Sequence, residues 1–195
     1  FHFELDLNGN GTLDTDDVAK GGVFQFGTAG RPVSGHWTGA GAGNDDRVGV
    51  FDGKFWYVDI NGNHILDAGE TIATNFRGRP IAGDWTGSGV DYVGTFQNNI
   101  FYLDMNGDFV FDAADEALGA MITFGFSSLG QLPVAADWDA DRDSNIGLWV
   151  PHRNGVVPRE AAEFYLDLGD PFTGPLSGPI STAFGGPGVQ PADPG

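Results

Sequence analysis

Four short strand-like motifs recur along this chain with a spacing of about fifty residues, and this repetition limits the folds open to it. Trp37, Trp85 and Trp138 each end one copy of the same motif, and they are 48 and 53 residues apart. A unit of this length buries its apolar faces by stacking on neighbouring units. Four short strands per repeat are typical of one blade of a β-propeller. A β-sandwich, the competing all-β fold, does not predict loops that repeat in register.

Each complete repeat contains a Pro-led strand, a Val-Gly strand, an aromatic strand that ends in Asp, and a strand that carries Phe. Copies of the Pro-led strand cover residues 32–37, 80–85 and 133–138, and copies of the Val-Gly strand cover 48–51, 92–96 and 145–149. The aromatic strand occurs at 1–6, 55–59, 101–104 and 164–167, and the Phe-bearing strand at 23–27, 72–76, 122–126 and 180–184. The only helical patterns, at 113–117 and 160–163, are about one turn long.

The fourteen predicted strands amount to three and a half blades. We therefore expect an all-β domain over residues 1–185, a β-propeller of about three and a half to four blades, and a Gly/Pro-rich linker or tail over 186–195. The chain shows no signal peptide and does not begin with Met, so we expect a mature fragment or an excised domain. A truncated propeller, a four-bladed ring with one thin blade and two chains closing a seven-bladed ring are the alternatives. The complete last repeat favours the first two.

The loop after each of the first three aromatic strands has the spacing of an EF-hand-type calcium loop. Oxygen-bearing side chains stand at loop positions 1, 3, 5, 9 and 12, and position 7 offers a backbone carbonyl. The candidate ligands are Asp6, Asn8, Asn10, Thr12, Asp14 and Asp17 in the first loop, Asp59, Asn61, Asn63, Ile65, Asp67 and Glu70 in the second, and Asp104, Asn106, Asp108, Val110, Asp112 and Asp115 in the third. A turn that binds nothing is the alternative for one copy. Three copies in register favour calcium.

Position 6 of these loops requires a sharp turn, and the three copies fill it differently. Gly11 suits the turn, whereas His64 and Phe109 predict a less ideal one.

A second acidic loop follows each tryptophan motif. The last copy places carboxylates and an amide at alternate positions, namely Asp137, Asp139, Asp141, Asp143 and Asn145, and it predicts a further metal site. The copy at 84–91 has hydroxyls at two of these positions and leaves metal binding open. The copy at 36–46 has lost its first Asp, and we interpret it as a plain turn.

The frame Gly-Asp-Trp-x-Gly-x-Gly-x-Asp-x-Val-Gly-x-Phe over 83–96 resembles the integrin-alpha-type FG-GAP (VCBS) repeat, and the Phe-Gly pairs at 26–27, 124–125 and 184–185 fit it. This resemblance implies a β-propeller with calcium in loops between adjacent strands. His36, Thr86 and Ser88 depart from it where carboxylates are expected. The loop at 6–17 is similar to those of dockerins, but a strand precedes it instead of a helix, which argues against cohesin binding.

The formal charge of −18, from 9 basic and 27 acidic residues, disfavours nucleic acid and anionic membrane surfaces as partners. Bound divalent cations would relieve this repulsion, although an acidic soluble surface alone is also common. The chain has no Cys, which excludes disulfides and thiolate metal sites, and no run of about 18 apolar residues for a membrane span. We expect an extracellular or cell-surface protein that does not insert into membranes.

The sequence favours no catalytic class. Paired carboxylates for glycoside hydrolysis stay open because Asp is abundant, but nearly every Asp already has a role in a repeating turn. The four histidines form no His-Glu-x-x-His pair, and Gly87-Ser88-Gly89 is not a nucleophile elbow. We predict a non-catalytic, calcium-binding module of a larger secreted or surface protein, bacterial in origin, with a structural or adhesion role and a protein or glycan partner. The alternative is a carbohydrate-binding module that uses exposed aromatic residues such as Trp56 and Trp149. A place in the core between blades is the favoured interpretation of each tryptophan.

Overall fold

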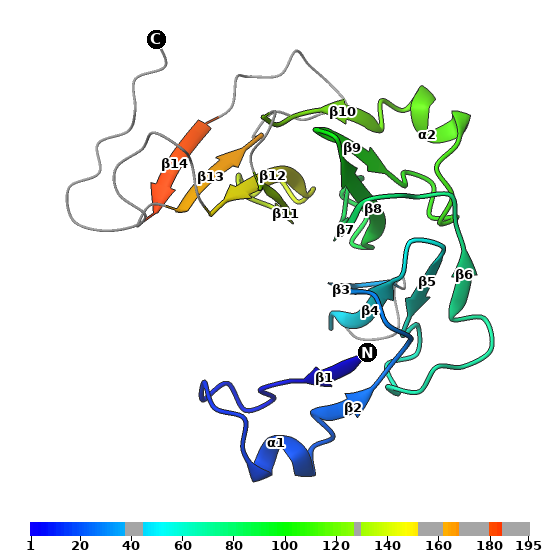
Figure 1. The fold of residues 1–195 in the computed structure, drawn as a ribbon, viewed down its shortest axis with the longest axis vertical. Coiled ribbons are helices and arrows are strands. Elements are labelled where there is room, and N and C mark those ends of the chain that lie inside the picture. The colour runs from blue at the N-terminus through cyan, green and yellow to red at the C-terminus, as the bar shows by residue number, and fades with distance from the viewer. Residues whose placement is uncertain (38–44, 127–129, 152–161, 168–179, 185–195) are drawn as a thin grey trace.

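Short antiparallel strands dominate the computed structural model, which describes residues 1–37, 45–126, 130–151, 162–167 and 180–184 (Figure 1). The described strands are β1 (His2–Glu4), β2 (Val23–Gln25), β3 (Arg31–Gly35), β4 (Arg47–Phe51), β5 (Phe55–Val58), β6 (Thr71–Ala73), β7 (Arg79–Gly83), β8 (Tyr92–Gln97), β9 (Ile100–Leu103), β10 (Met121–Thr123), β11 (Leu132–Ala136), β12 (Asn145–Val150), β13 (Ala162–Leu166) and β14 (Ile180–Phe184). The two helices are α1 (Thr15–Ala19) and α2 (Ala113–Ala117). Each predicted strand motif overlaps one of these strands, so the all-β prediction is confirmed. The Phe-bearing motifs were predicted too far along the chain, since β6 and β10 end three residues before 76 and 126.

The strands form three four-stranded antiparallel sheets, β3–β6, β7–β10 and β11–β14, and one two-stranded sheet, β1–β2. Corresponding strands pair in the same register, because Gly49 faces Val58, Gly94 faces Leu103, and Gly147 faces Leu166. The sheets follow one another around an arc with β3, β7 and β11 toward its inside (Figure 1), and β7 lies beside both β3 and β11. Over the described ranges the arc is open, and closure into a propeller stays a prediction.

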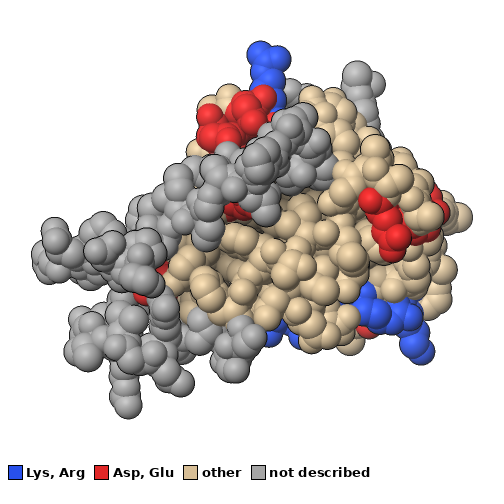
Figure 2. Space-filling model, turned by 90° about the horizontal axis from the view of Figure 1, so that it is seen from above, with Lys and Arg blue, Asp and Glu red and all other residues tan. Residues whose placement is uncertain are grey.

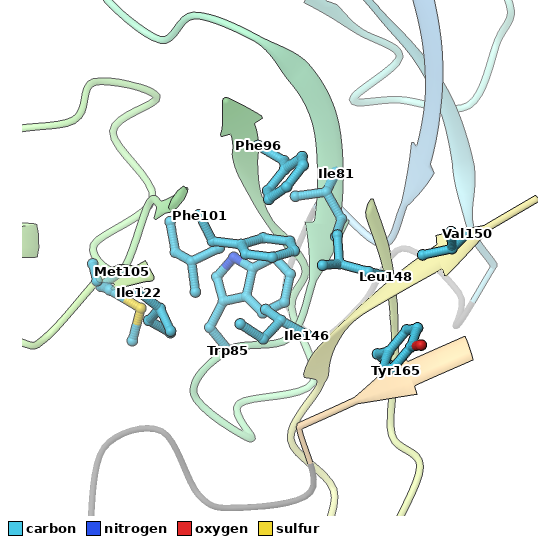
Figure 3. Close-up of a cluster of buried hydrophobic side chains, with 12 residues drawn as sticks. Ile81, Trp85, Phe96, Phe101, Met105, Ile122, Ile146, Leu148, Val150 and Tyr165 are labelled. Atoms are coloured by element: carbon cyan, nitrogen blue, oxygen red, sulfur yellow. The ribbon is translucent and has the colours of Figure 1, made fainter. Parts of the chain in front are cut away.

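A tryptophan fills the space between each pair of consecutive four-stranded sheets. Trp85 follows β7 directly and shares a buried cluster with Leu103 of the β7–β10 sheet. Its indole lies beside Ile146 of the next sheet (Figure 3). Trp37 occupies the equivalent place between Val58 and Val93.

A glycine two residues before each tryptophan leaves room for the indole. An added Cβ on Gly83 would lie 2.7 Å from an atom of the Trp85 ring and 2.7 Å from the Ser144 Cβ. An added Cβ on Gly35 would likewise lie 2.8 Å from the Trp37 ring. The Gly-x-Trp motif is therefore a packing requirement between sheets.

A two-point hydrogen-bonded contact also joins consecutive sheets next to each buried tryptophan. The His36 N–H donates to the Asp91 carboxylate at 2.8 Å, and the Asp91 N–H donates back to the His36 carbonyl at 2.8 Å. One sheet further on, the Asp84 N–H donates to the Ser144 Oγ at 3.0 Å, and the Ser144 N–H donates to the Asp84 carbonyl at 2.7 Å. A carboxylate and a hydroxyl thus perform the same role.

The Asp91→Asn variant is expected to be more stable than the wild type at pH 7, by an amount that shrinks as the pH falls. Burial raises the pKa of Asp91 above its ordinary value, so the folded state holds this proton more tightly than the unfolded state. The cost of ionising Asp91 in the fold is absent below its unfolded pKa and is fully present above its folded pKa. Asn removes the charge and keeps an oxygen for the His36 N–H.

Urea denaturation from pH 7 downward measures this difference, with Asp45→Asn as the control that removes one exposed charge. If the stability gain of Asp91→Asn grew toward low pH, the pKa of Asp91 would not be raised by burial.

The two helices account for unequal repeat lengths. Met121 follows Asp104 by 17 residues, and α2 occupies five of them, whereas Thr71 follows Asp59 by only 12 residues. Gly69, with φ of 97°, turns the chain directly into β6 in that shorter copy.

The helix predictions are partly wrong. The pattern at 113–117 forms α2, but the sequence did not indicate α1. The predicted turn at 160–163 is wrong in its second half, since Ala162 and Glu163 belong to β13, where pairing with β12 and β14 prevails over local preference. Residues 160–161 and the predicted tail over 186–195 lie outside the described residues.

Candidate metal-binding loops

The first residue of each EF-hand-like loop organises the turn through its carboxylate. In the first loop, Asp6 accepts hydrogen bonds from the N–H groups of Gly9 at 2.7 Å and Gly11 at 2.7 Å. Asp59 and Asp104 accept the corresponding bonds, from the residues at positions 4 and 6, at distances between 2.6 and 3.0 Å. The three loops therefore share one backbone scaffold.

Position 6 adopts a left-handed conformation in all three loops. The φ angle is 80° at Gly11, 61° at His64 and 66° at Phe109. The prediction that the last two turns would be less ideal is therefore wrong for the backbone path, although side chains at positive φ carry a local energetic cost. His64 stacks on Phe24 of the preceding sheet, with ring centroids 3.9 Å apart, and this packing helps to hold the turn.

Position 12 closes each loop. Both carboxylate oxygens of Asp115 accept backbone N–H groups, from Met105 at 2.8 Å and from Asp112 at 3.0 Å. Glu70 and Asp17 make the equivalent two bonds to positions 2 and 9 of their loops at 2.8–2.9 Å. All three carboxylates are buried. The side chain at position 12 therefore holds positions 2 and 9 of its loop together. Its role as a metal ligand stays a prediction.

Positions 3, 5 and 9 converge in the first two loops. The side-chain amides of Asn61 and Asn63 both donate to the Asp67 carboxylate at 2.8 Å, and these bonds lower the pKa of Asp67. Asn10 donates to Asp14 in the first loop at 2.8 Å, with the same effect on its pKa. In the third loop Asn106 donates instead to Asp108, at 3.1 Å. These contacts are made by the amide NH2 groups, while the predicted ligand oxygens of Asn61 and Asn63 accept the N–H groups of Asn63 and Ile65. Convergence of ligand oxygens on one centre stays a prediction for these three loops.

The first carboxylate differs in burial between the loops. Asp6 is exposed, and the N–H of Gly11 lowers its pKa most strongly. Asp104 is fully buried, and burial raises its pKa to about 6 despite the bonds from Phe109 and Gly107. Asp6 and Asp104 accept hydrogen bonds from the same loop positions, so the opposite shifts of their pKa values follow from their different exposure to solvent. A cation beside Asp104 would offset the cost of its buried charge.

The acidic loop at 137–145 brings three carboxylates together. One oxygen from each of Asp137, Asp139 and Asp141 lies within 4.8 Å of the other two, a spacing that can hold a metal ion. All three side chains are exposed, and no basic side chain pairs with them within the described ranges.

The other two predicted ligands of this loop, Asp143 and Asn145, lie outside the group of three. The Asp143 N–H donates to Asp141 at 3.2 Å, and the Asn145 side-chain oxygen accepts the Trp138 N–H at 3.0 Å. These contacts shape the loop around the three carboxylates.

The equivalent loop at 84–91 is closed by its own hydroxyl groups. The Asp84 carboxylate accepts the Thr86 and Ser88 hydroxyls at 3.3 Å each and the Gly89 N–H at 2.6 Å. Hydroxyl donors therefore stand where the later loop has the carboxylates of Asp139 and Asp141. This loop has the donors to satisfy the Asp84 carboxylate without a cation, and its other carboxylate, Asp91, accepts the His36 N–H. Most of the 36–46 loop lies outside the described residues.

Tryptophan exposure bears on the carbohydrate-binding alternative. Trp56 is completely buried and stacks on Phe51 with ring centroids 4.3 Å apart, which confirms the core position expected of it and removes it as a sugar-binding residue. Trp149 is partly buried. Trp138, which sequence reasoning did not single out, is 41% exposed. The Ala at position 136, where the other repeats have Gly, is the sequence difference that goes with this exposure.

Comparisons of the chain with protein-family models, curated proteins and solved structures return no significant match. The helices in the described part are five residues each, and none is long and apolar enough to cross a membrane. The resemblance to FG-GAP repeats accordingly stays a prediction, and the geometry of the loops carries the functional argument.

Proposed function

We propose that this chain is a non-catalytic calcium-binding module with the architecture of a β-propeller segment and a structural or adhesion role in a secreted or cell-surface protein. The convergence of the Asp137, Asp139 and Asp141 carboxylates within 4.8 Å carries the proposal. Calcium prefers several hard oxygen ligands on a flexible acidic loop, which this arrangement offers. The three EF-hand-like loops would add further sites of the same chemistry.

The charge distribution supports bound cations. The chain carries a net charge of −18, and Figure 2 shows Asp and Glu side chains in separate clusters with few Lys or Arg on the same face. Several carboxylates in the loops are also buried, including those of Asp59, Asp104 and Asp115. Buried and clustered negative charge destabilises a fold unless it is compensated, and divalent ions compensate it efficiently.

The position of the loops supports a structural role for calcium. The third loop touches the preceding sheet, since the Thr74 hydroxyl donates to the Phe109 carbonyl at 2.6 Å. The Asn75 side-chain N–H donates to the Phe111 carbonyl at 2.7 Å, and the Phe111 N–H donates to the Asn75 side-chain oxygen at 2.8 Å. An ion that stiffens this loop would therefore also stiffen the contact between the β3–β6 and β7–β10 sheets.

The arrangement of the sheets supports the propeller architecture. Three four-stranded meanders in the same register follow one another around an arc, with corresponding strands on the inside. This order is the one that propeller blades have.

Terbium luminescence tests the site at 137–145, because Tb³⁺ replaces Ca²⁺ and Trp138 lies in the loop as a sensitiser. We expect wild-type protein to give Tb³⁺ emission that Ca²⁺ displaces. The double variant Asp139→Asn/Asp141→Asn should lose the part of this emission that Trp138 sensitises, and Trp138→Phe should remove the same part. The control Asp16→Asn/Asp45→Asn removes the same charge elsewhere. Equal emission from the control and the loop variant would contradict the proposal.

A further inference from the structure

A cavity of about 170 Å³ lies between the β3–β6 and β7–β10 sheets. Pockets for drug-sized ligands measure roughly 300–1,000 Å³, so this one has room for a single ring. Its walls combine aromatic rings with polar side chains, namely Asn75, Phe76, Arg77, Gln97, Tyr102 and Phe111. Phe111 packs edge-on against both Phe76 and Tyr102, with ring centroids 6.0 and 5.2 Å apart, and these contacts hold the apolar walls in place.

The tyrosine in this cavity differs from its counterparts in the other four-stranded sheets. Tyr57, Tyr102 and Tyr165 hold the same repeat position, because each comes directly before the residue that faces the glycine of the Val-Gly strand. The Tyr57 hydroxyl donates to the Asp52 carboxylate at 3.0 Å, and the Tyr165 hydroxyl donates to the Glu163 carboxylate at 2.7 Å. Among the residues that the structure describes, none hydrogen-bonds to the Tyr102 hydroxyl.

A neutral residue stands where the β3–β6 sheet has this carboxylate. Gln97 follows Phe96 at the end of its strand as Asp52 follows Phe51, so an amide replaces the group that accepts the tyrosine hydroxyl. The side-chain amide of Gln97 also forms no hydrogen bond within the described ranges. An amide both donates and accepts hydrogen bonds, so it suits the hydroxyl groups of a sugar.

Arg77 supplies a cation beside this neutral amide. Its guanidinium donates to the Phe76 carbonyl and pairs with no carboxylate in the described part of the chain. The chain has 27 acidic residues and only 9 basic ones, so an arginine without an acidic partner is unusual in it. A planar guanidinium binds a carboxylate through two parallel hydrogen bonds. The cavity therefore offers two groups, Arg77 and Tyr102, that a carboxylate from outside the chain would satisfy.

The end of the sheets on which Arg77 lies is basic, although the whole chain is acidic. In the first two four-stranded sheets, the connections at this end are 26–31, 51–55, 74–79 and 97–100. They contain one carboxylate, Asp52, and four basic side chains, namely Arg31, Lys54, Arg77 and Arg79. The loops at the opposite end, 59–70, 84–91 and 104–115, contain nine carboxylates and no Lys or Arg.

The distance between these two ends allows an anion to bind at the basic one. The strands β3 and β7 are five residues long, which separates the ends by roughly 16 Å. This is about twice the Debye length of about 8 Å at physiological ionic strength. The acidic loops are therefore largely screened from the basic end, and the overall charge of −18 does not exclude an anionic ligand there.

We infer that Arg77, Gln97 and Tyr102 form a binding site for a uronic acid residue, a sugar ring with a carboxylate, carried by an acidic glycan. The carboxylate accepts hydrogen bonds from the Arg77 guanidinium and the Tyr102 hydroxyl, in place of the carboxylate that the counterpart tyrosines find within the chain. The ring hydroxyls bind the Gln97 amide, and an apolar face of the ring packs against the aromatic walls. The site uses none of the predicted calcium ligands, so its failure and that of the proposed function are separate.

An NMR titration of the isotope-labelled full chain tests this site, with methyl glucuronide and methyl galacturonide as probes and the corresponding neutral glycosides as controls. We expect saturable shifts of the Gln97 side-chain amide and the Arg77 Nε–H with at least one uronide. The neutral glycosides should bind at least about tenfold more weakly, and the Arg77→Gln chain should show the same loss for the uronide. Lys54→Gln is the matched control, since both side chains are exposed at the basic end but only Arg77 lines the cavity.

The Gln97→Asp chain restores the carboxylate that the β3–β6 sheet has at this position. It should lose uronide binding without a fall in melting temperature, because the new carboxylate accepts the Tyr102 hydroxyl. Retained binding by this chain would overturn the site.

Absence of saturable binding of both uronides would also overturn the site, and so would equal affinity for the neutral glycosides or unchanged affinity of the Arg77→Gln chain. N-acetylglutamate amide offers a carboxylate without a sugar ring and should bind at least about tenfold more weakly than the uronide. Equal binding of this compound would overturn the assignment of the ligand as a sugar.

Discussion

The Trp85→Ala variant is expected to lose about 3–5 kcal/mol of unfolding free energy, because it empties a fully packed site between two sheets. Trp85 is 1% exposed and contacts buried side chains from both the β7–β10 and β11–β14 sheets. The loss is a large part of the roughly 5–15 kcal/mol typical of a folded domain. Gly83→Ala should cost about 1–3 kcal/mol through overpacking, since its new Cβ meets the indole and Ser144 at 2.7 Å.

Urea denaturation followed by circular dichroism measures both changes. Trp138→Ala is the matched control, because Trp138 ends the same motif but is 41% exposed, and it should cost less than about 1 kcal/mol. Equal losses for Trp85→Ala and Trp138→Ala would contradict the role of the tryptophan as the filler between sheets.

Removal of calcium is expected to lower the melting temperature by roughly 5–10 °C for each occupied site. A ligand that binds only the folded state stabilises it by about 2.7 kcal/mol at a hundredfold excess over its Kd. For a chain of this size, 1 kcal/mol corresponds to about 2–4 °C. Thermal unfolding in saturating Ca²⁺ and in excess EDTA gives the difference directly, with Mg²⁺ at the same ionic strength as the control.

Limited proteolysis should localise the effect of calcium removal. The third loop is tied to the neighbouring sheet through Thr74 and Asn75, so loss of its ion should expose the segment between Asp104 and Asp115 to cleavage. Identical melting curves and cleavage rates in Ca²⁺ and EDTA would show that the loops are ordinary turns.

The strand pattern could be predicted from the sequence because each strand is a local run of apolar residues at a repeated position. The roles of single residues in packing between sheets could not be predicted in this way. The need for Gly83, for example, depends on the distance between two sheets. The short helix α1 was missed because Thr15–Ala19 has no apolar periodicity. Asp14 and Asp17 form its capping box, but in the sequence they also occupy ligand positions 9 and 12 of a calcium loop.

The candidate sites were also predictable only in part. Loop spacing predicted the convergence of Asp137, Asp139 and Asp141, since alternate residues in a tight turn share one side. The second role of position 12 was not predictable from spacing, because the bonds of Asp115 to Met105 and Asp112 depend on the folded path of the loop.

Isothermal titration of Ca²⁺ into chelator-treated protein tests the central claim most directly. We expect heat corresponding to four equivalents, from the three EF-hand-like loops and the loop at 137–145. The Asp6→Ala variant should retain three of them, because Asp6 is exposed and its loss should not unfold the chain. Absence of calcium-dependent heat from the wild-type chain, or the same stoichiometry in the Asp6→Ala variant, would contradict the assignment of these loops as calcium sites.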